Sequence, residues 1–247
     1  MSRSCLLAAA LAVLLIPFVE AREPKCATSS SPRFTGLLTN RLSNKEMERW
    51  KEVERIVFAE DANRQPLHPT LRGLWEWIET SGHTVYVEFV RNNHVISCTA
   101  GEFLIEHLDR SGENHIAAIQ LNLTNINDAY VGAETKRPNG FVPFLGLKKE
   151  ERYAEVLGHE LAHAVHILTS LERARAVVEF VQKTNQLLLS RHPRQKKSGL
   201  APELKHRVSK RDALLQKLEE QAEEMEKVVW AELAAHKTKP PQLATKD

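Results

Sequence analysis

The residues best suited to do chemistry lie in the segment Val156–Val165, which contains the pattern His-Glu-x-x-His. On an α-helix, His159 and His163 stand four residues apart on one face, so both imidazoles can bind the same metal ion. Neutral imidazole is a good zinc ligand, and two histidines leave tetrahedral positions open for another protein ligand and a water. Glu160 is turned by about 100° from His159, which places its carboxylate beside the ion. There it can take a proton from a water and later deliver it to a leaving amine.

The segment VLGHELAHAV as a whole resembles the active-site helix of the zincin metallopeptidases. This resemblance implies one zinc ion, a protein or peptide substrate, and peptide-bond hydrolysis by a zinc-activated water with Glu160 as general base. It further implies that an extended substrate is held along an edge strand, here Ile116 to Leu123 or a neighbouring strand.

The third zinc ligand separates the zincin branches from one another. His166 shares the face of His159 but lies roughly 10 Å along the helix, so we do not expect both to ligate one ion. His166 is either a residue lining the site or an ordinary helix residue. A metzincin would have its third His at the position of Thr169 and a Gly that ends the helix, and this sequence has neither.

A glutamate from a later helix, as in the gluzincins, is the remaining choice for the third ligand. Glu219-x-x-Ala222-Glu223 resembles a gluzincin pattern in which a small residue lets two helices approach and an acidic one holds a ligand His. We therefore predict zinc ligation by His159, His163 and Glu219, with Glu226, Glu223 and Glu232 as alternatives to Glu219. The thermolysin-type Asn-Glu-x-x-Ser-Asp sequence is absent. Three residues are candidate oxyanion stabilisers, and spacing selects none of them: Tyr130, Tyr153 and His206.

The elements that must position these residues predict an α+β fold. Helices are expected over 45–58 and 71–79, strands over 84–90, 96–99 and 116–123, and helices over about 148–168, 170–190 and 204–236. We expect a small, mainly antiparallel sheet followed by a helical half with a long C-terminal helix. One zincin-like domain would span 44–236, divided near 147, with a flexible segment at 22–43 and a disordered tail at 237–247.

The first 21 residues predict export. A basic start precedes the apolar run CLLAAALAVLLIPF, and short residues follow up to Ala21, as in a secretory signal peptide. The run of about 14 residues is short for a membrane anchor, which needs roughly 20. We therefore expect cleavage after Ala21, no stable membrane anchor, and a secreted or periplasmic location. Cleavage would leave Cys26 and Cys98, either disulfide-bonded or both free.

Composition narrows the remaining functions. The chain has 34 Lys and Arg against 32 Asp and Glu, and this balance argues against a nucleic-acid binder that works by bulk charge. Two hypotheses compete with the peptidase: a zincin-derived protein that holds zinc without turnover, and a helical interaction module with an accidental motif. The sequence leaves the oligomeric state open.

Overall fold

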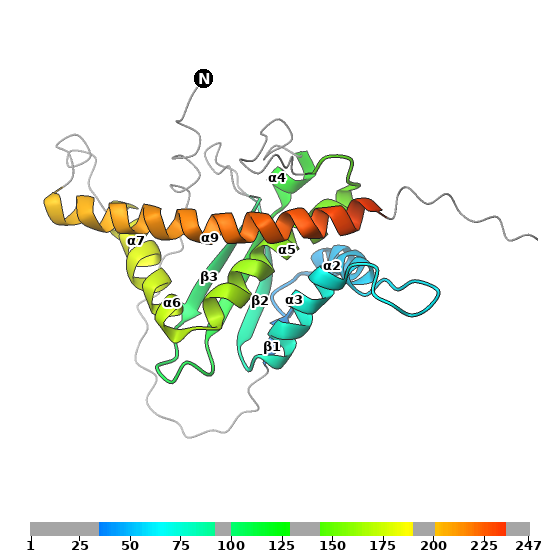
Figure 1. Ribbon diagram of the computed structural model, residues 1–247, viewed down its shortest axis with the longest axis horizontal. Helices are drawn as coiled ribbons and strands as arrows, with labels where there is room; N and C mark the ends of the chain where they lie inside the picture. The colour runs from blue at the N-terminus through cyan, green and yellow to red at the C-terminus, as the bar shows by residue number, and fades with distance from the viewer. Residues whose placement is uncertain (1–34, 92–99, 129–143, 190–200, 236–247) are drawn as a thin grey trace, which may run out of the picture.

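The computed structural model describes residues 35–91, 100–128, 144–189 and 201–235. The first half contains, in chain order, β1 (Gly36–Leu38), α2 (Asn44–Val57), α3 (Pro69–Thr80), β2 (Thr84–Val90), β3 (Gly101–His107), β4 (Ile116–Asn122) and α4 (Leu123–Asp128). The second half contains α5 (Lys149–Leu168), α6 (Leu171–Ala176), a π-helix η2 (Val177–Gln182), α7 (Lys183–Leu189) and α9 (Pro202–Ala235). The predicted α+β class is confirmed, with a sheet followed by a helical half that ends in one long helix (Figure 1).

The sheet is mixed, and the prediction that it is mainly antiparallel was wrong. Its strand order is β1-β2-β4-β3, and the first two pairings are parallel while β3 runs antiparallel to β4. The reason lies in the connections. Helices α2 and α3 carry the chain from the end of β1 back to the start of β2, and such a crossover makes neighbouring strands parallel.

Two strands were missing from the sequence prediction. β1 falls within the segment expected to be flexible, and its three residues pair with β2 from Gly36 opposite Thr84. The backbone N–H of Leu37 also donates to the Glu79 carboxylate at 3.1 Å. β3 follows directly on a segment outside the described residues. Neither strand carries the clear alternation of apolar and polar residues by which a strand is predicted.

The two helices before β2 form where the sequence predicts them. α2 begins with a capping box, in which the Ser43 N–H donates to Glu46 at 2.9 Å, and it buries Trp50, Val53 and Val57. α3 begins with Pro69, whose missing N–H is not needed in a first helical turn.

The helical half departs from prediction in one place. The expected helix over 170–190 is interrupted by the π-helical turn η2 between α6 and α7. The long helix α9 crosses α5 and also packs against η2 and α7, as the orange and red ribbon of Figure 1 shows.

The main hydrophobic core joins the sheet, α2, α3, α5 and the C-terminal part of α9. α5 is its centre, because fourteen of its twenty residues are buried. A second, smaller cluster lies between β3, the end of α5, and the α6–η2 segment. The His-Glu-x-x-His motif therefore sits on a helix that is fixed from several sides.

Some of the predicted features fall outside the described residues. These are the signal peptide, residues 22–34, Cys26 and Cys98, the strand at 96–99, and the tail from 237. Within the described part of the chain, no helix combines the length and apolarity that a membrane span requires.

Candidate metal centre

Helix α5 presents His159 and His163 side by side. Their residues are 9% and 8% exposed, and their Nε2 atoms lie 3.1 Å apart. The two rings meet edge to face with centroids 4.8 Å apart. The apolar spacing of the segment buries this face of the helix, so the predicted common face of the two histidines is confirmed.

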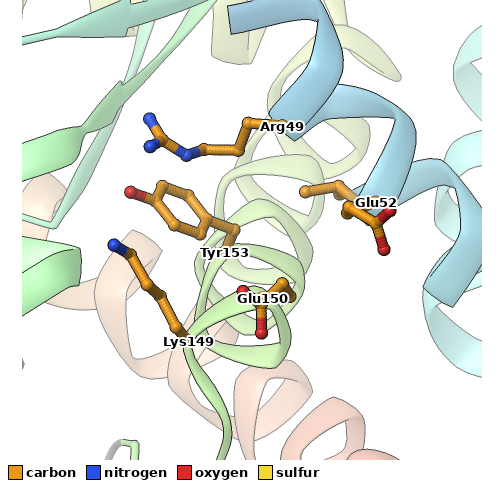
Figure 2. A pocket seen from close by; sticks show the side chains of 6 residues that line it. Arg49, Glu52, Lys149, Glu150 and Tyr153 are labelled. Atoms are coloured by element: carbon orange, nitrogen blue, oxygen red, sulfur yellow. The ribbon is translucent and has the colours of Figure 1, made fainter.

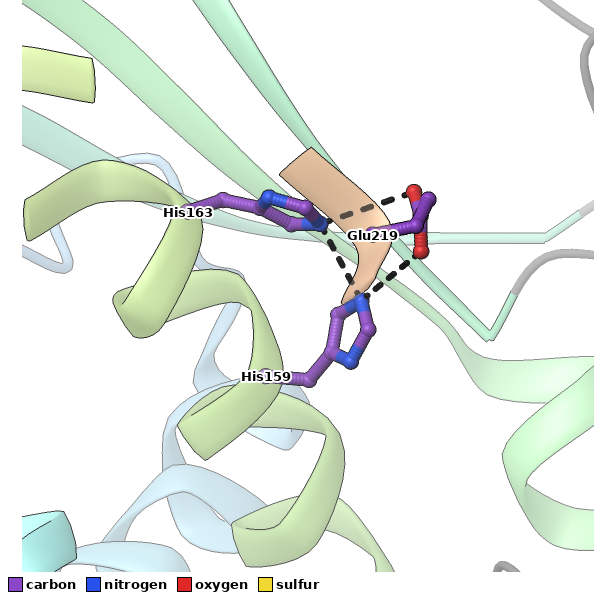
Figure 3. Close-up of side chains that lie close together, drawn as sticks. All are labelled: His159, His163 and Glu219. Carbon is purple, nitrogen blue, oxygen red and sulfur yellow. Dashed lines mark hydrogen bonds and ion pairs between the residues drawn. The ribbon is translucent and has the colours of Figure 1, made fainter. Parts of the chain in front are cut away.

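Helix α9 brings Glu219 to the same point. One carboxylate oxygen lies 3.5 Å from the His159 Nε2, and the other lies 3.5 Å from the His163 Nε2 (Figure 3). The two helices approach closely because α5 has Gly158 where they cross. A Cβ atom there would meet both methyl groups of Val229 at 3.1 Å. The preferred third residue, Glu219, therefore lies with the two histidines.

These donor atoms lie close enough together to approach one small ion. Zinc bonds of about 2.0–2.2 Å place neighbouring ligand atoms about 3.3–3.6 Å apart in a tetrahedron. Here the two Nε2 atoms lie 3.1 Å apart, and each lies 3.5 Å from a different Glu219 oxygen. With one ligand atom taken from each residue, the three atoms lie within 4.8 Å of one another. Two imidazole nitrogens and a carboxylate are also the donor types that zinc takes in proteins. His159, His163 and Glu219 thus form a group that could hold a metal ion.

Glu226 occupies the position behind His159. Its Oε2 lies 3.2 Å from the His159 Nδ1, and the Glu226 residue is 4% exposed. A carboxylate at Nδ1 favours the tautomer with the proton on Nδ1, which leaves Nε2 free to bind a metal. Burial alone lowers the pKa of His159, but the charge of Glu226 and hydrogen bonds to Glu219 and Glu226 outweigh it and raise that pKa well above the usual value.

Glu232 and Glu223, the remaining candidates for the third ligand, lie outside the group. Glu232 accepts the Thr70 N–H at 3.0 Å and so caps the start of α3. Glu223 is not among the three residues whose donor atoms converge. The predicted carboxylate support for a ligand His is therefore supplied by Glu226, two turns beyond Glu219.

The candidate centre is open to solvent on the side of Glu219. Its side chain is 49% exposed, against 11% and 10% for the side chains of His159 and His163. Burial tends to raise the pKa of Glu219, but hydrogen bonds with the two histidines outweigh it and hold the pKa well below its usual range. Water and other small ligands can approach from this side.

Glu160 lies beside the group without belonging to it. It is 4% exposed, and its carboxylate packs against the backbone of Gly101 in β3. A Cβ on Gly101 would stand only 2.5 Å from the Glu160 Oε1. Burial first, and then the charges of Glu219 and Glu226, raise the pKa of Glu160 to about 8 despite the opposing effect of His159. Burial and the charge of Glu160 likewise raise the pKa of Glu102 to about 8.

The edge strand near Glu160 is β3. The sequence favoured Ile116 to Leu123 or a neighbouring strand, and the first choice was wrong because β4 lies between β2 and β3. The N–H of Asn122 donates to the carbonyl of Ala100 at 2.8 Å, so Ala100 and every second residue after it along β3 direct their backbone groups toward β4. Since alternate residues of an antiparallel strand face its partner, the N–H and C=O groups of Gly101, Phe103 and Ile105 point away from β4.

His166 lies one turn beyond His163 and is not part of the donor group. Its ring nitrogen Nδ1 contacts the Arg173 guanidinium at 3.3 Å. Burial, and then the charges of Arg173 and Lys217, lower the pKa of His166. The absence of His166 from the group agrees with the expected separation along the helix.

None of the oxyanion candidates in the described residues reaches the centre. The Tyr153 hydroxyl donates to Asn127 at 2.7 Å, and Tyr153 precedes His159 by six residues, roughly 9 Å along α5. His206 precedes Glu219 by thirteen residues, roughly 20 Å along α9. Tyr130 lies outside the described residues.

A small cavity opens near the start of α5, away from the donor group. Its volume is about 150 Å³, and its lining residues are Arg49, Glu52, Val53, Lys149, Glu150 and Tyr153 (Figure 2). Arg49 lies over the Tyr153 ring at 5.3 Å from the centroid. The cavity is lined by two cations and two carboxylates, so its lining favours neither sign of charge.

Sequence reasoning missed two neighbours of the centre, Glu226 in its supporting role and Gly101. Glu226 could be found from the sequence only once the crossing of α5 and α9 is known. Gly101 begins a strand that the sequence did not predict, so nothing in the local sequence marked it as a neighbour of the centre. Comparisons of the chain with protein-family models, with curated proteins and with solved structures found no match.

Proposed function

We propose that this chain is a zinc-dependent peptidase, with His159, His163 and Glu219 as the zinc ligands and Glu160 as the general base. One observation carries the proposal: two imidazoles and a carboxylate converge within 4.8 Å of one another, beside the buried carboxylate of Glu160, which is not one of them. The peptidase chemistry rests on this arrangement and on the resemblance of the α5 segment to zincins.

Each residue has a definite task in this proposal. Zinc bound by the three donors would act as a Lewis acid and make a water a stronger nucleophile near neutral pH. Glu226 holds His159 in the tautomer that keeps Nε2 available. Glu160 holds the proton taken from the attacking water and passes it to the leaving amine.

The surroundings of Glu160 also favour a peptide as substrate. The N–H and C=O groups of Gly101 and Phe103 that point away from β4 have no strand beside them among the described residues, and Gly101 touches Glu160. An extended peptide could hydrogen-bond to this edge with a carbonyl close to Glu160. The contact between Glu160 and β3 would therefore place the general base next to the backbone of a peptide bound along this strand.

The test is hydrolysis by the wild-type chain and by Glu160→Gln, on a mixture of unrelated peptides read by mass spectrometry. We expect cleavage by the wild type, loss of cleavage with the chelator 1,10-phenanthroline, and cleavage at least about 1,000-fold slower in Glu160→Gln. Zinc content measured in both proteins should be equal. Zinc in both with cleavage in neither would instead support the non-catalytic zinc protein. Zinc in neither would support the helical interaction module.

Export of the protein is part of the proposal as well. The segment ending at Ala21 predicts that the mature chain begins near Arg22. N-terminal sequencing of protein recovered from the exporting cell or its medium would check this. A start at Met1 would contradict it.

A further inference from the structure

Among the described residues, no strand pairs with the outer edge of β3, and a side chain blocks this edge at the C-terminal end of the strand. The Gln182 Nε2 donates a hydrogen bond to the carbonyl oxygen of Ile105 at 2.8 Å. Ile105 is one of the residues whose backbone groups point away from β4, so this bond takes the place that a further strand would use. Gln182 is the last residue of the π-helix η2, and it comes from 77 residues further along the chain.

The hydrogen bond between Gln182 and Ile105 is supported by apolar packing around Ile105. Ile105 is 5% exposed and belongs to the smaller hydrophobic cluster with Ile167, Ala174, Val177 and Leu218. The other polar atom of the Gln182 amide, Oε1, is buried. In Figure 1 the α6–α7 segment lies beside the end of the β3 arrow. A peptide strand therefore cannot displace the amide without opening this cluster.

The opposite end of β3 is the one that reaches the candidate centre. Gly101 contacts Glu160, whereas Ile105 packs with Ile167 at the end of α5. Helix α5 and strand β3 thus run alongside each other, with the general base at one end and the Gln182 closure at the other. The stretch between them that can pair with a peptide is Gly101–Phe103.

We propose that Gln182 limits the substrate to peptides that have no more than about three residues on one side of the scissile bond. Three residues is the length of a peptide that pairs with Gly101–Phe103 residue for residue. This inference rests on the proposed peptidase function. The substrate class is therefore peptides cut close to one end. A longer peptide must bend away from β3 before Ile105, where it loses its ladder hydrogen bonds.

The experiment uses nested peptides around one bond that the wild-type chain cleaves. The peptides are extended one residue at a time, from one to six residues, first on one side and then on the other. On one side we expect kcat/KM to rise up to the third residue and then to fall about three- to tenfold, the value of one backbone hydrogen bond. On the other side no such maximum is expected.

The variant Gln182→Ala should remove the fall beyond the third residue and leave the shorter peptides nearly unchanged. Gln186→Ala is the matched control, because Gln186 is an exposed glutamine one turn further along the same helical segment. It should keep the wild-type length profile. If Gln182→Ala is unfolded by circular dichroism, Gln182→Asn serves instead, since its amide is one methylene too short to reach Ile105.

Two results would overturn the inference. One is a wild-type profile with no maximum on either side; the other is the same profile in wild type and the folded Gln182 variant. If the wild-type chain binds zinc but cleaves nothing, the proposed function fails, and binding of the nested peptides of a generic alanine-rich sequence to the wild-type chain then decides the inference. Affinity that peaks at three residues supports it, whereas affinity that keeps growing with length, or no binding at all, contradicts it.

Discussion

The Oε2 atom of Glu226 lies 3.2 Å from the Nδ1 of His159, while Glu219, seven residues earlier on the same helix, lies 3.5 Å from the Nε2 of that ring. One face of α9 thus holds His159 from both of its nitrogens. Seven residues are close to two helical turns, which is why two carboxylates on one helix can reach opposite sides of one imidazole. The position of α9 along α5 therefore decides whether a metal site forms.

This relationship predicts that Glu226 supports zinc affinity without being a ligand. Glu226→Ala should weaken zinc binding about 10- to 100-fold, because His159 loses the partner that fixes its tautomer. Glu226→Gln should lose less, since its amide oxygen can still accept from Nδ1. Zinc competition with a chromophoric chelator measures both. Glu224→Ala, at an exposed position of α9, should keep wild-type affinity; equal affinity in all four proteins would disprove the role of Glu226.

Gly101 predicts a specific loss of activity. A methyl group there would overlap the Glu160 carboxylate at 2.5 Å, so Gly101→Ala must displace either Glu160 or the start of β3. We expect kcat/KM for peptide hydrolysis to fall at least about tenfold with zinc content unchanged. Gly73→Ala is the control, because a Cβ at Gly73 meets nothing within 4 Å and its helix should gain about 0.5–1 kcal/mol. Full activity in Gly101→Ala would show that the contact does not matter.

At Gly158, by contrast, we expect a substitution to reduce the stability of the fold. Its added methyl would press on both methyl groups of Val229, a fully buried residue whose branched side chain has little freedom to move. Gly158→Ala should lower the free energy of unfolding by about 1–3 kcal/mol and weaken zinc binding, because α9 must shift away from α5. Urea denaturation and the same zinc competition measure the two effects. Unchanged values of both would mean that the helices do not cross this closely.

The raised pKa of the half-buried Glu102 carboxyl leads us to expect a pH dependence of stability. Its folded pKa of about 8 is above the usual 4.5, so the folded state holds a proton that the unfolded state has lost. The stability contributed by this proton is fully present below about pH 4.5 and is lost as the pH rises through about 8. Glu102→Gln should therefore gain stability relative to the wild type as the pH rises from 5 to 9.

Urea denaturation of chelator-treated protein at a series of pH values checks this prediction. The exposed Glu113→Gln serves as control and should run parallel to the wild type. A Glu102→Gln curve that is also parallel would show that the Glu102 carboxyl is not held protonated.

Local sequence predicted what local physics decides. The spacing of His159 and His163 and the β-branched run of β2 each fix a structure within a few residues. Glu219 was favoured by a resemblance that also lies within one helix, the pattern Glu219-x-x-Ala222-Glu223.

What the sequence could not predict depends on elements that meet from far apart. The direction of the β1–β2 pairing follows from a crossover of two helices, and the three residues of β1 gain their conformation from β2 and Glu79. The role of Glu226 depends on the crossing of α5 and α9. The bond from Gln182 to Ile105 joins residues 77 positions apart, and no local pattern signals it.

The most direct measurement is the zinc content of the purified full-length chain, by elemental mass spectrometry after dialysis against zinc-free buffer. We predict one zinc per chain in the wild type and in Glu160→Gln, and about none in His163→Ala. Glu219→Ala should hold zinc at least about tenfold more weakly than the wild type but more tightly than His163→Ala, since it keeps both imidazole ligands and loses only the more exposed carboxylate. A wild-type chain that retains no zinc, or a His163→Ala chain that retains a full equivalent, would contradict the proposed metal centre.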